Sequence, residues 1–399
     1  MNVLLTGTFV SSLGDKSAAL AFALYAASMG STALMAAILL AQLLPSLVLG
    51  LIGGYLTDRY GNPLWWSAAL VVQALCFAAL SQVDTVWPIV SLIAASSAAQ
   101  SIVGPMGSVL LRELSPVERR GRSVRRRTSL DGMAGVIGLM LAGLSYSWLN
   151  RSTLLLVNSA SFLVLVLCSL VALRGSVRRP RFRGSARARP ERWTGFGVLL
   201  RPEVFGRQGV FLIFVVILGT SLEGVVGIFY LQHGLGLGNT WYSVAIASWS
   251  LGLLLGSLRV PVDRASDAGG RLLGASACVM GAVIAAPTLL PLTGGSVALA
   301  FLIGGAANGA FNASVAVVIA ERASSETQGR AWAAFAFLAK LAILLGYASG
   351  AAAGMDHARA LMFAAGAVPV LIGLGHVLTR SRPAPAQTPE VSVREGSST

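Results

Sequence analysis

Long apolar runs recur along the whole chain, separated by short polar segments. A helix that crosses a bilayer needs about 20 mostly apolar residues, so this pattern predicts twelve membrane-spanning helices. The predicted spans cover residues 3–28, 34–56, 64–82, 88–111, 128–149, 153–173, 209–232, 241–258, 272–290, 296–319, 331–354 and 360–378. The uncharged stretch 272–320 holds two of these spans, because Pro291, Gly294 and Gly295 predict a tight turn between them. We therefore expect an all-α polytopic membrane protein.

Composition excludes a soluble domain. The 399 residues are 55% hydrophobic and only 12% charged, whereas soluble chains carry about 25% charged residues. Cys76, Cys168 and Cys278 all lie inside apolar runs, so neither a disulfide framework nor a metal site is predicted, and no cofactor is expected. The first run lacks a basic leading segment and contains Asp15 and Lys16, which favours an uncleaved span over a signal peptide.

The net charge of +14 reflects membrane orientation rather than nucleic-acid binding. If the N-terminus is cytoplasmic, 26 of the 30 basic residues lie in cytoplasmic segments. Only Arg151 and Arg359 lie in external loops, and the two lysines lie inside spans. This asymmetry predicts that both termini are cytoplasmic. The excess of arginine over lysine and the abundant alanine suggest a GC-rich bacterium, and therefore a bacterial inner membrane.

The arginine-rich segment 174–208 divides the chain. Pro180, Pro190 and Pro202 interrupt it, and six predicted spans lie on either side, so it is interpreted as a solvated linker against anionic headgroups. The expected organisation is a six-helix bundle over 1–173, the linker, a second bundle over 209–379, and a disordered cytoplasmic tail over 380–399, rich in Pro, Ser and Thr. We expect a monomer.

Two short motifs occur once in each half of the chain. Asp58-Arg59 recurs as Asp263-Arg264, an offset of 205 residues. A Glu-x-x-Gly-Arg motif at Glu118, Gly121 and Arg122 recurs at Glu326, Gly329 and Arg330, an offset of 208 residues. The two offsets nearly agree, and all four occurrences of the motifs fall on the same predicted side of the membrane. The sequence therefore predicts two pseudo-symmetric six-helix bundles in parallel orientation.

The segment Gly54-Tyr55-Leu56-Thr57-Asp58-Arg59-Tyr60-Gly61 resembles the loop 2–3 signature of the major facilitator superfamily of transporters. Ser12-Leu13-Gly14-Asp15, Gly104-Pro105 and Pro116-x-Glu118 are most similar to its macrolide-efflux and siderophore-exporter branch. The resemblance covers residues 1 to about 380. It implies two bundles around a central cavity, a transported small molecule and alternating access.

The same resemblance implies a cytoplasmic gate built from the paired loop motifs. Its residues would be Gly54, Asp58, Arg59, Gly61, Glu118, Gly121, Arg122, Asp263, Arg264, Glu326, Gly329 and Arg330. The alternative is a plain turn carrying an orientation charge. Three departures weaken the match to proton-coupled drug antiporters: Asn62-Pro63 replaces a basic pair, the segment Gly138–Gly143 lacks the proline of their span 5 pattern, and Ser97 stands where many have arginine.

Four ionisable side chains fall inside predicted spans: Asp15, Lys16, Glu223 and Lys340. Such residues are costly in a membrane and normally face a partner or a wet cavity. At about 1.5 Å per residue, Asp15, Glu223 and Lys340 lie about 18, 21 and 14 Å from the cytoplasmic ends of their spans, in a core of about 30 Å. Counting 43 residues back from the two Asp-Arg motifs reaches Asp15 and Thr220, one turn from Glu223.

We expect Asp15 and Glu223 to alternate between pairing with Lys340 and binding a proton or a cationic substrate, with Lys16 as a weaker candidate. The alternative is structural: a local Asp15–Lys16 pair and a static Glu223–Lys340 brace. Polar candidates for the cavity are Asn308, Asn312, Gln100 and Gln42. Small-residue spacings such as Gly252-x-x-x-Gly256 and Gly346-x-x-x-Gly350 predict close helix packing.

The function expected from these features is proton-coupled export of amphipathic small organic molecules. One alternative is an importer or uniporter of a small metabolite with the same fold, and another is a transport-dead sensor or assembly partner. An intramembrane aspartyl protease is disfavoured, because Ser12-Leu13-Gly14-Asp15 lacks the first glycine of that motif. No enzyme is expected, since the chain has no zinc-protease, serine-hydrolase or phosphate-loop motif.

Overall fold

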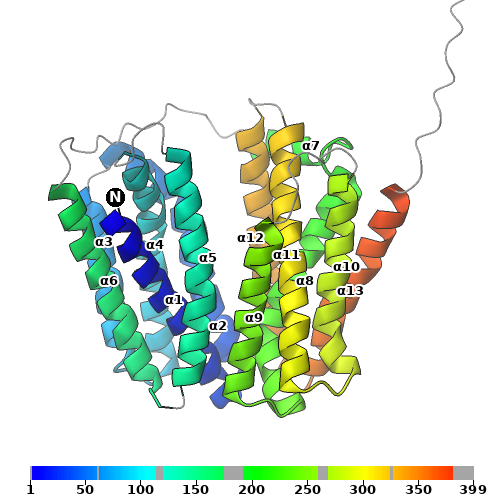
Figure 1. The fold of residues 1–399 in the computed structure, drawn as a ribbon, viewed down its shortest axis with the longest axis horizontal. Coiled ribbons are helices and arrows are strands. Elements are labelled where there is room, and N and C mark those ends of the chain that lie inside the picture. The colour runs from blue at the N-terminus through cyan, green and yellow to red at the C-terminus, as the bar shows by residue number, and fades with distance from the viewer. Residues whose placement is uncertain are drawn as a thin grey trace, which may run out of the picture.

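The computed structural model describes residues 2–60, 63–113, 120–146, 148–174, 192–258, 268–323 and 327–380. The regular structure in these ranges is helical (Figure 1). The first group of helices is α1 (Asn2–Ser28), α2 (Thr32–Tyr60), α3 (Pro63–Leu80), α4 (Val86–Glu113), α5 (Arg120–Ser145) and α6 (Arg151–Arg174). The second is α8 (Gly206–Phe229), α9 (Asn239–Leu258), α10 (Ala268–Leu289), α11 (Gly294–Arg322), α12 (Gln328–Ala353) and α13 (Ala358–Arg380).

These twelve long helices correspond one to one with the predicted spans, including the break between α10 and α11. Two elements were not predicted. The segment expected as a linker contains a short helix, α7 (Arg192–Leu199), which packs on α12, and α8 ends in a π-helical turn, η2 (Tyr230–Gly234). Helix α5 also begins eight residues earlier than the predicted span, at Arg120, within an arginine-rich segment.

Consecutive long helices run in opposite directions, so their connections alternate between two ends of the molecule. We call the end at which α1 begins the upper end, and the opposite one the lower end (Figure 1). Among the described residues, nine helices are long and apolar enough to cross a membrane, and two further apolar helices, Leu64–Leu80 and Leu130–Ser145, are shorter. Exposed tryptophans near both ends, Trp65 above and Trp87 and Trp148 below, match the aromatic belts of membrane proteins.

Helices α1–α6 pack mainly on one another, as do α8–α13. Across the two groups, the largest contacts are between α5 and α9 and between α2 and α12. The two groups share one contact pattern, as the internal repeat predicts: α1 packs on α5 and α6 as α8 packs on α12 and α13, and α2 packs on α4 as α9 packs on α11. The chain is therefore an all-helical membrane protein with two six-helix halves.

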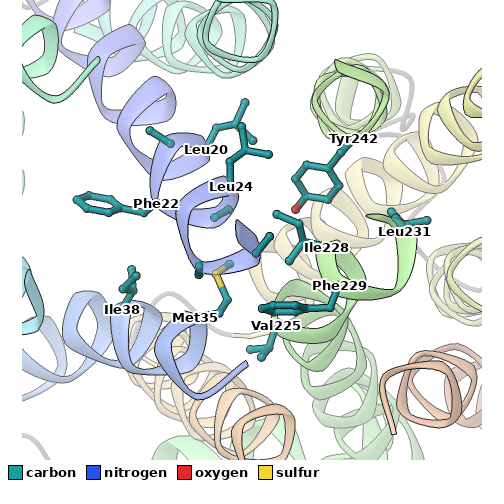
Figure 2. Close-up of a cluster of buried hydrophobic side chains, with 14 of the residues drawn as sticks. Leu20, Phe22, Leu24, Met35, Ile38, Val225, Ile228, Phe229, Leu231 and Tyr242 are labelled. Carbon is teal, nitrogen blue, oxygen red and sulfur yellow. The ribbon is translucent and has the colours of Figure 1, made fainter. Parts of the chain in front are cut away.

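Among the described residues, the buried apolar side chains that join the two halves lie toward the lower end. One cluster, which we call the shared core, draws on both halves. Figure 2 shows part of it, with Leu24 of α1 and Met35 of α2 beside Ile228 and Phe229 of α8. Toward the upper end the two halves have separate cores, one around Trp66 and Phe162 and the other around Leu212 and Phe311. The lower end is therefore sealed between the halves by apolar contact.

Glycine seams bring helix backbones together within the second half. Gly252 and Gly256 of α9 lie against the backbone of α11 around Ala306, and Gly305 and Gly309 of α11 lie against the backbone of α9. Because both helices present glycine, their backbones approach without intervening side chains. This confirms the packing role predicted for Gly252-x-x-x-Gly256. Gly346 and Gly350 likewise abut α8.

The two arginines of the predicted external loops have equivalent roles. Arg151, at the start of α6, donates from Nη2 to the Val83 carbonyl oxygen at 2.5 Å, and Arg359, near the start of α13, donates from Nη2 to the Thr288 carbonyl oxygen at 2.9 Å. The donors are 208 residues apart and the acceptors 205. In each half, the arginine thus satisfies a carbonyl near the lower end of the third helix.

Replacing Gly305 with alanine tests the α9–α11 seam. The new Cβ would lie 2.8 Å from the Trp249 carbonyl carbon and closer still to its oxygen, so the helices must separate. We expect a loss of about 1–3 kcal/mol in stability, measured as a lower temperature of heat-induced loss of the monodisperse gel-filtration peak in detergent.

Gly375→Ala is the matched control, because a Cβ at Gly375 meets no atom within 4 Å. If G305A melts at the same temperature as G375A, the seam does not contribute to stability.

Candidate functional site

A cavity of about 530 Å³ lies within the first half of the molecule, among α1, α3, α4, α5 and α6. Its apolar wall includes the rings of Phe9, Trp66 and Phe162. Four charged side chains also line it: Asp15, Lys16, Arg127 and Asp131. Their formal charges sum to zero. The cavity combines aromatic surface with charges of both signs.

Helix α1 contributes the polar wall because of its helical spacing. Thr8, Ser12 and Asp15 follow at intervals of four and three residues, which places them on one face. Gly14, on another face, lies so close to α6 that a Cβ there would be 2.6 Å from Ser161 Oγ and would collide with the Asn158 amide oxygen. Asp15 is thereby held beside α6.

Asp15 is half-buried and accepts a hydrogen bond from Asn158 Nδ2 at 3.3 Å. The Asn158 side chain is fully buried, and Ser161 Oγ donates to its Oδ1 at 3.1 Å, which orients the amide nitrogen toward Asp15. Asp15 is close enough to Lys16 and Asp131 for the charges to interact. No salt bridge of Asp15 is found among the described residues. A carboxylate with one neutral donor can still accept a proton or a ligand cation.

Asp131 and Arg127 of α5 are site residues that the sequence analysis did not select. Ser12 Oγ donates to Asp131 Oδ1 at 2.8 Å, which joins α5 to the polar face of α1. Arg127, one turn above, interacts electrostatically with Asp131. The predicted span began at residue 128 and so placed Asp131 at a helix start. Because α5 begins at Arg120, Asp131 instead lies about 16 Å into the helix.

Of the amides predicted to face the cavity, Gln100 does so. Its Oε1 accepts a hydrogen bond from Gln73 Nε2 at 2.9 Å. Gln42 is exposed and does not line the described cavity; its backbone carbonyl accepts from Ser97 Oγ at 2.5 Å. In the second half, Asn312 Nδ2 donates to Asn308 Oδ1 at 2.9 Å, so these amides pair along one face of α11.

Glu223 and Lys340 lie in the second half and do not line the cavity around Asp15. Glu223 is half-buried on α8, close enough to Tyr242 of α9 for the two side chains to interact electrostatically. Tyr242 points from α9 toward α8 (Figure 2). Among the described residues, Glu223 has no hydrogen bond or salt bridge. The structure therefore does not bring Asp15, Glu223 and Lys340 together.

The register of α8 against α12 explains why Glu223 and Lys340 are apart. Gly346 abuts the stretch Leu218–Leu222 and Gly350 abuts Val225, so the helices run parallel with an offset of roughly 125 residues. This offset puts Lys340 level with residues near 215. Glu223 is about eight residues lower, or about 12 Å along the helix. The static Glu223–Lys340 brace is therefore not formed in this conformation.

For all the predicted gate residues except Arg330, the structure does not describe the side-chain environment. Gly61, Glu118, Asp263, Arg264 and Glu326 are outside the described residues. For Gly54, Asp58, Arg59, Gly121, Arg122 and Gly329 the helix backbone is described but the side-chain environment is not. Arg330 is exposed, and its backbone lies against Gly195 of α7 at the upper end. The gate therefore stays a prediction.

Comparison with solved structures identifies the fold. The crystal structure of the nucleoside transporter NupG matches with a TM-score of 0.76 and 15% identity, covering 96% of this chain and 100% of that chain. A bacterial homologue of the iron transporter ferroportin, in an inward-facing state, matches with a TM-score of 0.73 and 14% identity, covering 96% and 98%. A bacterial homolog of the human lysosomal transporter Spinster, inward-facing and unoccupied, gives 0.66 and 13%, covering 96% and 98%. At these identities the likeness concerns the fold alone.

Comparison by sequence assigns the family. No curated protein sequence matches the chain. The sequence pattern of the family described as Major Facilitator Superfamily matches residues 4–347, most of the chain. This match agrees with the twelve long helices, the internal repeat and the shared fold. The chain belongs to the major facilitator superfamily of membrane transporters.

Proposed function

We propose that the chain is a proton-coupled exporter of amphipathic small organic molecules, such as a drug, an antibiotic, a siderophore or another secondary metabolite. It works by alternating access, with the upper end in the cytoplasm of a bacterial cell. The observation that carries the proposal is the cavity around Asp15, which joins aromatic walls to charges of both signs. An amphipathic molecule needs both kinds of surface. Its apolar part packs on rings while its polar groups reach charged side chains.

Alternating access is supported by the distribution of apolar contacts. The halves share one core at the lower end and have separate cores toward the upper end. Rocking the halves about their α5–α9 and α2–α12 contacts would exchange the sealed end for the open one. The cytoplasmic assignment of the upper end rests on the basic residues of the connections at that end.

Coupling to protons is supported by the carboxylates. Asp15 and Glu223 are half-buried in long apolar helices, and neither forms a salt bridge among the described residues. An ionised carboxylate in such a place is costly, so binding a proton or a substrate cation stabilises it. Lys340, about 12 Å above Glu223, would approach Glu223 only if α12 moved relative to α8, which makes the pair a reporter of conformation.

Asp15→Asn and Glu223→Gln test the coupling. In proteoliposomes with an imposed pH gradient, we expect the wild-type protein to move protons when a substrate from a panel of lipophilic cations, macrolides and siderophores is added. Both variants lose an acidic group that can exchange its proton, so we expect substrate-driven proton movement to be abolished. A pH-sensitive dye inside the vesicles measures it.

Asp356→Asn is the control, because Asp356 is an exposed acid in the α12–α13 connection at the lower end. It should behave as wild type. Substrate flux without proton movement in wild-type protein would indicate a uniporter. Silence across the panel in every protein would favour the transport-dead alternative, and unchanged coupling in E223Q would remove Glu223 from the mechanism.

Phe229→Ala tests the sealed lower end. Phe229 is 1% exposed in the shared core, and removing such a ring costs about 3–5 kcal/mol of packing. About 1.4 kcal/mol changes a two-state ratio tenfold, so the population open at the upper end should fall severalfold or more. A Thr8→Cys reporter in the cavity, in a background without Cys76, Cys168 and Cys278, should then react more slowly with a hydrophilic maleimide.

The matched control is Phe363→Ala, since Phe363 is 42% exposed on α13 and leaves the shared core intact. Equal labelling rates in F229A and F363A would mean that the shared core does not select the conformation.

A further inference from the structure

We infer that Asp131, held in place by the hydroxyl of Ser12, is a second coupling carboxylate of the Asp15 cavity, whose negative charge favours proton binding at Asp15. The inference deepens the proposed coupling function and rests on it. Asp131 has no counterpart among the residues that the internal repeat singles out. Its placement becomes visible only when α5 is packed against α1.

The geometry that carries the inference links two helices at one depth. Ser12 Oγ donates to Asp131 Oδ1 at 2.8 Å, and Ser12 precedes Asp15 by three residues, on the same face of α1. Asp131 is exposed and Asp15 is half-buried, yet both line the same cavity. The Ser12 hydroxyl therefore fixes the Asp131 carboxylate on the side of α5 that faces Asp15.

The surroundings of the two carboxylates contain few other charges. In the part of the cavity that the structure describes, Lys16 of α1 and Arg127 of α5 are the facing cations. The polar groups facing Asp15 from α4 and α6, Gln100 and Asn158, are neutral amides. With both carboxylates ionised, the four charges balance. A proton that binds Asp15 from water leaves the cavity with a net charge of +1.

Because of this charge balance, the carboxylate pair can exchange a bound proton for a cationic substrate. Repulsion between two carboxylates is relieved when one of them takes up a proton, and the resulting positive charge disfavours a cationic substrate. Binding a cation reverses the balance and favours release of that proton to water. Proton and cationic substrate therefore exclude one another at the pair.

Modification by dicyclohexylcarbodiimide, which reacts with protonated carboxyl groups, tests the pair without a known substrate. In purified full-length protein, the extent of Asp15 modification is measured by peptide mass spectrometry as a function of pH. Asp131→Asn removes a neighbouring negative charge. We expect the pH of half-maximal Asp15 modification to fall by roughly half a unit or more. If the substitution changed only the access of the reagent, the maximal extent of Asp15 modification would change and the pH of half-maximal modification would not.

Variants of Ser12 distinguish loss of the hydroxyl that positions Asp131 from a general disturbance of the structure. Ser12→Ala releases the Asp131 carboxylate, so the Asp15 midpoint should shift in the same direction by a smaller amount, whereas Ser12→Thr keeps a hydroxyl and should match wild type. Asp356→Asn should leave the midpoint unchanged. An unchanged midpoint in D131N overturns the inference, even if D15N abolishes coupled transport. If D15N retains coupled transport while the midpoint shifts, the proposed role of Asp15 in coupling fails and the carboxylate pair stands.

Discussion

The shared core at the lower end is the constraint on which the rest of the structure depends. Side chains from both halves, including Leu24, Met35 and Phe229, pack into one continuous apolar cluster there. Toward the upper end each half has its own core. Among the described residues, the apolar cluster that both halves share therefore lies toward the lower end, whereas the Asp15 cavity lies within the first half. A polar cavity inside an apolar protein is thereby compatible with a sealed membrane barrier.

The charged side chains of the Asp15 cavity neutralise one another as a group rather than as close ion pairs. Asp15 and Asp131 each accept a hydrogen bond from a neutral side chain, from Asn158 and Ser12 respectively. The nearby cations neutralise the cavity as a whole. Side chains held in this way can exchange partners, whereas a closed ion pair would have to be broken first. The buried Arg151 at the lower end shows the contrast, since it forms a short salt bridge to Asp84 and stacks on Tyr25.

The two halves share their helix arrangement but differ in where they place their carboxylates. Arg151 and Arg359 satisfy equivalent carbonyls at the lower ends of the two halves, and the helix order is the same. The first half holds its carboxylates around a cavity, while Glu223 of the second half lies beside Tyr242. Duplicated backbone packing tolerates this divergence, because close helix contacts such as α9–α11 rest on glycines rather than on the polar side chains of the cavity.

The sequence by itself determined the number of long helices, their approximate bounds and the duplication, because the membrane requires long apolar runs and the loop motifs recur at a constant offset. It also selected Asp15 and Gln100, since isolated polar groups in apolar runs are costly. Only the tertiary structure decided which charges meet. The register of α8 on α12 separates Glu223 from Lys340, and the packing of α5 on α1 brings Asp131 to Ser12. Helix register and the extent of a helix into a charged segment depend on packing between distant segments, which hydropathy does not encode.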